Sequence, residues 1–280
     1  MITVGGLEFR KLARSIVAIL LMCLGIATAR AQAIEVRDHT ALRVCADPAA
    51  LPFSATDGTG FENRIAELLA KDLGVPVRYT WFPSVMGFYR QTLNARKCDV
   101  VIGTPPGLEM AATTIPYYRS TFMLVTRAAD PALDKGLDDP WLGGKTVGVQ
   151  AMTQAVDLLA HRSLIANIRS YELMVDSRIS SVGHDMLADL AAHKIDAAIV
   201  WGPIAAYQAG HEPGTFRLKS LGEEVDGVPM AFDMAMAVRN GEPQWRARLD
   251  RFIEEHSAEL QAILADAKVP QVGAEGEVDP

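Results

Sequence analysis

The chain has 280 residues, of which 49% are hydrophobic and 22% are charged. This composition is ordinary for a globular protein with a core, and it excludes collagen-like and disordered chains. The formal charge of −7 at pH 7 argues against nucleic acid or an anionic membrane surface as a partner.

The first 33 residues have the pattern of a secretory signal peptide. Arg10, Lys11 and Arg14 form a basic region, residues 16–29 are apolar, and Ala31-Gln32-Ala33 matches a cleavage site. The alternative, a retained membrane anchor, requires an apolar run of about 18 residues or more, and this run is shorter. We therefore expect cleavage after Ala33, a periplasmic location and no membrane insertion afterwards. The mature chain then carries 23 basic and 33 acidic residues, a formal charge of −10.

The next sixty residues alternate between strand and helix patterns. The clearest element is an amphipathic helix over 61–73, which ends at Gly74. The other predicted elements of this part are strand 42–47, loop 48–60, strand 77–82, helix 83–96 and strand 98–103. This alternation predicts a parallel sheet with helices on its faces.

A second, smaller α/β unit follows, and two extended apolar segments at 120–126 and 231–239 flank it. Its predicted elements are strand 144–150, helix 153–161, strand 169–175, helix 184–193 and strand 195–201. A long amphipathic helix with Trp245 and Ile263 on one face comes last. Two extended crossings indicate that one lobe is inserted into another, so the strand ends of the two lobes face each other across a cleft. We expect lobe 1 at 34–122 and 232–268, lobe 2 at 123–231, and a disordered tail at 269–280.

No motif of catalytic or cofactor chemistry stands in the sequence. Residues 143–146 resemble the end of a phosphate loop, but Asp139 occupies the position of its first glycine and a strand follows instead of a helix. The six histidines lack metal-ligand spacing, and no nucleophile elbow is present. We therefore expect no metal, no cofactor and no enzymatic activity.

Two cysteines, Cys45 and Cys98, remain in the mature chain. An even pair in an oxidising compartment makes a disulfide plausible, and both residues fall on strands expected to be neighbours. The alternative is two buried free thiols, because cysteine packs well as a small apolar residue.

Several stretches, in order, resemble the amino-acid-type, family 3 periplasmic solute-binding proteins: 60–63, 97–103, 116–118, 142–150 and 194–198. The resemblance implies an α/β fold of the periplasmic-binding-protein type II, with two lobes joined by two extended hinge crossings. A second set resembles the subgroup associated with quinoprotein dehydrogenases, including the J proteins of methanol oxidation clusters: 43–48, 51–54, 79–81, 94–99, 116–121 and 201–203. That resemblance implies a periplasmic accessory of a PQQ-dependent alcohol dehydrogenase, acting in its maturation or activation.

The sequence departs from the amino-acid binders at both of their charged anchors. The arginine that grips the ligand carboxylate is absent from 107–110, and Trp201-Gly202-Pro203 replaces the aspartate that pairs with the ligand ammonium. A buried charge without its partner costs about 2–5 kcal/mol. Free amino acids are therefore poor candidate ligands.

The predicted cleft mouth is mostly apolar, which suits an apolar pocket or a hydrophobic patch for a protein partner. Its candidate residues are Asp47, Phe53, Trp81, Thr104, Tyr117, Gln150, Met152 and Trp201. Phe53 and Trp81 fit lobe core equally well, whereas the turn after Trp201 favours the cleft. Two functions remain open: an accessory that contacts a dehydrogenase, and a receptor that delivers a small, weakly polar solute to an ABC transporter.

Overall fold

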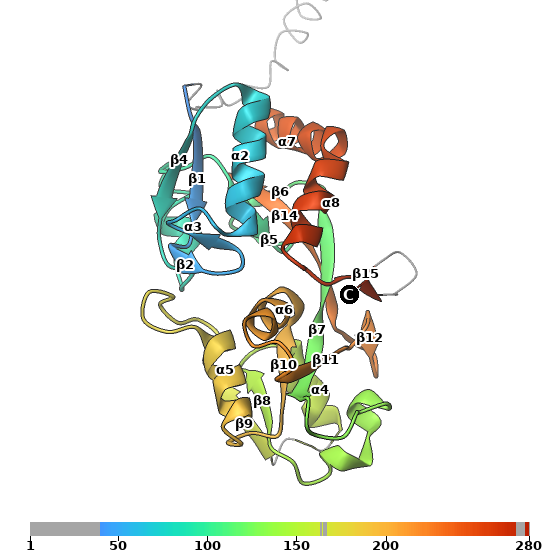
Figure 1. Cartoon of the computed structure of the whole chain (residues 1–280). Helices are drawn as coiled ribbons and strands as arrows, with labels where there is room; N and C mark the ends of the chain where they lie inside the picture. Colours follow the sequence, from blue (N-terminus) through green and yellow to red (C-terminus); the bar gives the residue numbers. More distant parts are fainter. Residues whose placement is uncertain (1–39, 163, 165–166, 273–277, 280) are drawn as a thin grey trace, which may run out of the picture. The chain divides into compact units, whose positions relative to one another are not determined.

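The computed structural model describes residues 40–162, 164, 167–272 and 278–279 (Figure 1). The predicted signal peptide and its cleavage site lie outside the described residues. All elements below belong to one contact unit. Within the described part of the chain, no helix is both long and apolar enough to cross a membrane.

The first half forms the expected parallel arrangement. Strand β1 (Leu42–Ala46) pairs in parallel with β4 (Val77–Trp81), and a parallel bridge from Val44 to Val100 attaches β1 to the chain just before β5 (Val101–Thr104). Helix α2 (Phe61–Leu73) has the predicted bounds and buries Phe61, Ile65 and Leu69 against this layer. Its end follows from Gly74, which adopts the left-handed conformation that glycine tolerates best.

The two extended segments are the long central strands of the main sheet. Strand β7 (Tyr118–Arg127) pairs through its first residues with β14 (Ala231–Val238) and through its later residues with β10 (Ala197–Trp201) and β11 (Phe216–Ser220). Strand β14 continues to β5, so hydrogen bonding runs in the order β5-β14-β7-β10-β8-β9. Strand β14 therefore bonds to the first half, β7 bonds to the second half, and their pairing with each other joins the two.

The second half repeats the α/β pattern around β8 (Val147–Gln150), which lies parallel to both β10 and β9 (Ile168–Tyr171). Helices α4 (Gln154–His161) and α5 (Val182–Ala191) occur close to their predicted places. Helix α6 (Gly202–His211) was not predicted, because Gly202-Pro203 was interpreted as a turn. Proline suits the first turn of a helix, where its missing N–H costs no hydrogen bond, and that explains the difference.

Two other predicted helices are wrong in length. Within 83–96 only α3 (Phe88–Gln91) is helical. Gly87 has a φ of 92°, which is not a helical conformation, so the helix cannot begin before it. The C-terminal helix is two helices, α7 (Pro243–Glu255) and α8 (Ser257–Asp266), separated by His256 in a non-helical conformation. The remaining short elements are β2 (Ala49–Ala50), β3 (Ser54–Ala55), β6 (Ala112–Thr113), β12 (Glu224–Val225), β13 (Val228–Pro229) and 3₁₀ turns at Gly136–Asp138 and Pro140–Leu142.

The expected disordered tail is ordered where it begins. Val269 and Val272 are buried, and Ser120 Oγ donates a 2.6 Å hydrogen bond to the carbonyl of Pro270. Strand β15 (Gln271–Val272) pairs with β16 (Val278–Asp279). The two valines supply the buried apolar area that a polar tail lacks.

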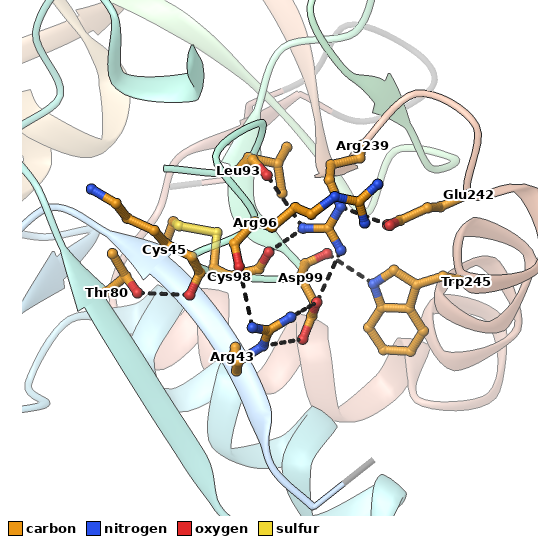
Figure 2. A network of polar contacts seen from close by, with 11 residues as sticks. Arg43, Cys45, Thr80, Leu93, Arg96, Cys98, Asp99, Arg239, Glu242 and Trp245 are labelled. Carbon is orange, nitrogen blue, oxygen red and sulfur yellow. Dashed lines mark hydrogen bonds and ion pairs between the residues drawn. A yellow bond between two sulfur atoms is a disulfide. The ribbon is translucent and has the colours of Figure 1, made fainter. Parts of the chain in front are cut away.

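The Cys45–Cys98 disulfide is formed, with its Cα atoms 5.5 Å apart, which decides between the two predicted states of these cysteines. Beside it, Asp99 is 1% exposed and binds two arginines (Figure 2). Arg43 donates two hydrogen bonds to its carboxylate, at 2.9 and 2.6 Å, and Arg239 donates a third at 3.0 Å. These contacts tie β1 to the residue pair before β5 and to the residue that follows β14.

Arg239 is itself buried and fully engaged. Its Nε donates to Glu242 at 2.7 Å, and its Nη1 donates to the carbonyls of Leu93 and Cys98 (Figure 2). The indole of Trp245 donates to the carbonyl of Asp99 at 2.9 Å. Buried charges in this region are thus neutralised by ion pairs and hydrogen bonds, as buried ions require.

Candidate functional site

A cavity of about 580 Å³ lies at the ends of β1, β5, β8 and β10, and residues of both halves line it. The first half contributes segments 45–54, 84–89 and 101–110, together with Glu62 and Met234. The second half contributes Gln150, Trp201, Ile204 and the loop and helix start at 173–183. The cavity therefore lies beyond the carboxyl ends of parallel strands, where open α/β sheets bind ligands.

Its wall is mostly apolar. Aromatic residues (Phe53, Phe88, Tyr89 and Trp201) and aliphatic ones alternate with a few serines and Gln150. Methionines Met86, Met110 and Met174 belong to the wall and are also exposed, Met86 by 84%. Methionine side chains are flexible and polarisable, and they occur often at surfaces that bind varied apolar partners.

Asp47 is one of two acids in the wall, and its carboxylate is fully engaged. It accepts hydrogen bonds from the amides of Ala49, at 2.9 Å, and Ser84, at 2.6 Å, and from the hydroxyl of Ser177. Its own backbone carbonyl accepts from Ser54 Oγ at 2.8 Å. Because Ser177 belongs to the second half, Asp47 joins the two sides of the cavity.

Glu62 is the second acid, and it has a different environment. It lies in the first turn of α2, and its amide donates to the carbonyl of Phe53 at 2.9 Å. The carboxyl lies against Gly103, where any Cβ would overlap its Oε1 atom. Burial, and then the charge of Asp47, raise the pKa of Glu62 to about 8. Among the described residues nothing pairs with this carboxyl.

The charge balance of the wall is one-sided. Among the described lining residues there are two acids and no lysine, arginine or histidine. No described residue of the wall is therefore a cation that could hold a ligand carboxylate.

The structure places four of the eight predicted site residues together. Asp47, Phe53, Gln150 and Trp201 all line the cavity. Trp201 also packs on Phe122, with ring centroids 5.3 Å apart, so one ring serves both core and wall.

The other four predicted residues lie elsewhere. Trp81 stacks on Tyr79 at 4.4 Å, because residues two apart on a strand share a face. Thr104 is buried and bonded to the hydroxyl of Tyr89 at 2.9 Å, one layer behind the wall. Tyr117 is 5% exposed and belongs to the core around α2, while Met152 is 83% exposed and does not line the cavity.

Three features of the cavity were missed from the sequence: Glu62, the exposed methionines and the 173–183 segment. Glu62 directly follows the buried Phe61 in the first turn of α2, so helical spacing alone does not distinguish it from a solvated acid on the same helix. The available signal was its place in the motif 60–63.

With the cavity placed, comparison with known proteins decides the family. Residues 42–266 match the model of bacterial extracellular solute-binding proteins, family 3. This chain belongs to that family. It is 30% identical to protein MoxJ of Methylorubrum extorquens over 268 residues, which cover 87% of this chain and 86% of the relative.

Solved structures agree with this family 3 assignment. The crystal structure of periplasmic binding protein XoxJ from Methylobacterium extorquens AM1 is 36% identical, with a TM-score of 0.70 over 83% of this chain and 99% of that one. MxaJ from Methlophaga aminisulfidivorans MPT is 22% identical, with a TM-score of 0.69 over 82% and 99%, and it shows the fold alone. The predicted family 3 fold, with its α/β architecture, is thus confirmed.

Proposed function

We propose that this family 3 protein is a periplasmic accessory of a PQQ-dependent alcohol dehydrogenase of the methanol-oxidising kind. It acts in maturation or activation of that enzyme by holding an apolar segment of it in the cavity, and it catalyses no reaction itself. The observation that carries this proposal is the wall of the cavity, which is apolar, edged with exposed methionines and free of basic residues among its described members.

The departure from amino-acid binding supports the proposal. A free amino acid presents a carboxylate, and no described lining residue offers it a positive charge. The Asp47 carboxylate would repel it, and Glu62 would add to this repulsion once the pH exceeds its pKa of about 8. We expect calorimetry against the twenty standard amino acids to detect no micromolar binder, and one such binder would favour transport instead.

The relatives support the choice of partner. The subgroup that this sequence resembles accompanies quinoprotein dehydrogenases, and the names MoxJ, XoxJ and MxaJ among its relatives fit that subgroup. Export follows from the same proposal, with Ile34 as the mature N-terminus. Mass spectrometry of the periplasmic fraction tests this, and a full-length, membrane-bound product contradicts it.

Deletion and complementation test the role of the cavity. Loss of the gene should lower quinoprotein dehydrogenase activity in periplasmic extract, and the wild-type gene should restore it. Met174→Glu puts a charge on the apolar wall and should fail to restore activity. Met152→Glu is the control, because Met152 is also an exposed methionine but lies off the wall, and it should restore activity fully. Full activity in the deletion strain would end the accessory proposal.

A second function keeps support from the family itself. The receptor of an ABC transporter would use the same cavity, whose volume of about 580 Å³ is within the range of small-molecule sites. Its solute would be small and weakly polar, since no described residue of the wall carries the positive charge that an anion needs. Micromolar binding of such a solute, together with normal dehydrogenase activity in the deletion strain, would select this function.

A further inference from the structure

Glu62 is a carboxyl group without a partner in the wall of an apolar cavity. Its side chain lies in the space that the missing side chain of Gly103 leaves open, and no described residue donates a hydrogen bond or an ion pair to it. An unpaired carboxyl group in an apolar wall destabilises the folded protein unless a bound group forms a hydrogen bond or an ion pair with it. The stability of the apo protein does not explain why an acid stands here.

We infer that the cavity binds a single protonated amine or guanidinium, carried by a lysine or arginine within the apolar segment, and that Glu62 is the group that receives it. The inference rests on the proposed function, because it specifies the segment that the cavity holds. The charge of the wall is of one sign: among its described residues two are acids and none is basic.

The second acid explains why a cation is favoured over a neutral donor. Asp47 is engaged by two backbone amides and Ser177, and its charge already acts on Glu62. A cation placed at Glu62 is attracted by both carboxylates, whereas an amide or hydroxyl gains only a hydrogen bond. The aromatic faces of Phe53 and Tyr89 in the same wall add a favourable environment for a cation on an apolar stem.

Binding of the cation is coupled to loss of a proton. In the empty protein at pH 7 Glu62 holds its proton, because its pKa is raised to about 8. The incoming ammonium favours the carboxylate, so the carboxyl proton leaves to solvent as the cation binds. Affinity should therefore rise from pH 6 to pH 9, a range in which a lysine side chain, with a pKa of about 10.4, stays charged.

Three blocked pentapeptides that differ only at the centre test this inference: acetyl-Leu-Val-Lys-Val-Leu-amide and the same peptide with Gln or Glu in place of Lys. Calorimetry with the mature protein should give the order Lys over Gln over Glu, with Lys at least about tenfold tighter than Gln. Titrations in two buffers of different ionisation enthalpy should show release of nearly one proton at pH 7 for the Lys peptide alone.

Glu62→Gln should abolish both the preference for Lys and the proton release. Glu67→Gln, an exposed acid on the same helix, is the matched control and should retain both. Equal binding of the Lys and Gln peptides to wild type, or a preference that survives Glu62→Gln, overturns the inference and leaves the proposed function standing. No binding of any peptide overturns both. If hexylammonium binds as tightly as the Lys peptide, the inference that the cation is carried by a peptide segment is wrong.

Discussion

Two carboxyl groups in the first half of this protein differ in burial and in their neighbours: Asp99 is 1% exposed, whereas Glu62 is partly exposed in the cavity wall. Asp99 receives three hydrogen bonds from Arg43 and Arg239 and follows a disulfide-bonded cysteine (Figure 2). Glu62 faces a cavity, with Asp47 as its charged neighbour and no described partner. The first arrangement stabilises the fold, whereas the second leaves a protonated carboxyl group without a partner inside the described part of the protein. The difference separates a structural acid from a candidate binding acid.

The largest expected effect on stability comes from substituting Asp99. Asp99→Asn removes the charge that balances two arginines, one of which is almost fully buried, so the free energy of unfolding should fall by about 3–5 kcal/mol. Urea unfolding measures it. Asp266→Asn is the control, because its ion pair with Arg64 is exposed and is worth about 1 kcal/mol or less. Equal losses for the two variants would remove the distinction between a buried network and a surface pair.

The second largest expected effect is the loss of stability when the space that Glu62 occupies is filled. Gly103→Ala introduces a Cβ where Oε1 of Glu62 lies, so the acid must move, at a cost of about 1–3 kcal/mol typical of overpacking. The same substitution in a Glu62→Ala background should cost less, because the overlapping atoms are gone. Additive losses in a double-mutant cycle would show that Glu62 does not depend on Gly103.

The smallest expected effect is a pH dependence of the free energy of unfolding. The pKa of Glu62 rises from an ordinary value of 4.5 to about 8 in the folded protein. Between pH 4.5 and pH 8 the folded state therefore keeps a proton that the unfolded state has lost. The contribution to stability is present below pH 4.5 and is lost as pH rises towards 8. From pH 5 to pH 8.5 the wild type should lose about 1 kcal/mol more than Glu62→Gln, because each unit of pKa shift is worth about 1.4 kcal/mol and solvent access reduces it. Thermal unfolding across that range measures the difference, and parallel curves for both proteins would contradict it.

The spacing of apolar residues along the chain was sufficient to predict most helices and strands and the fold. Helix α2 has the bounds that its apolar spacing predicts, since the positions at helical spacing are the ones that pack on β1 and β5. The parallel order of β1 and β4 followed from alternation of strands and helices along the chain, and the long strands β7 and β14 followed from the two extended apolar segments. Breaks set by one residue were not predicted, as at Gly87 and His256, because an apolar stripe continues across them.

The amino-acid sequence by itself determined the family, the α/β architecture, the absence of the charged anchors for an amino acid, and two possible states for Cys45 and Cys98. Only the tertiary structure decided which side chains share the cavity. Trp81 and Trp201 both end strands, yet one stacks on Tyr79 at the sheet edge and the other lines the cavity, because strand order sets what lies beyond each strand end. The state of Glu62 likewise depends on Gly103 and Asp47, which are 41 and 15 positions away in the sequence and meet it only when β1, β5 and α2 pack together.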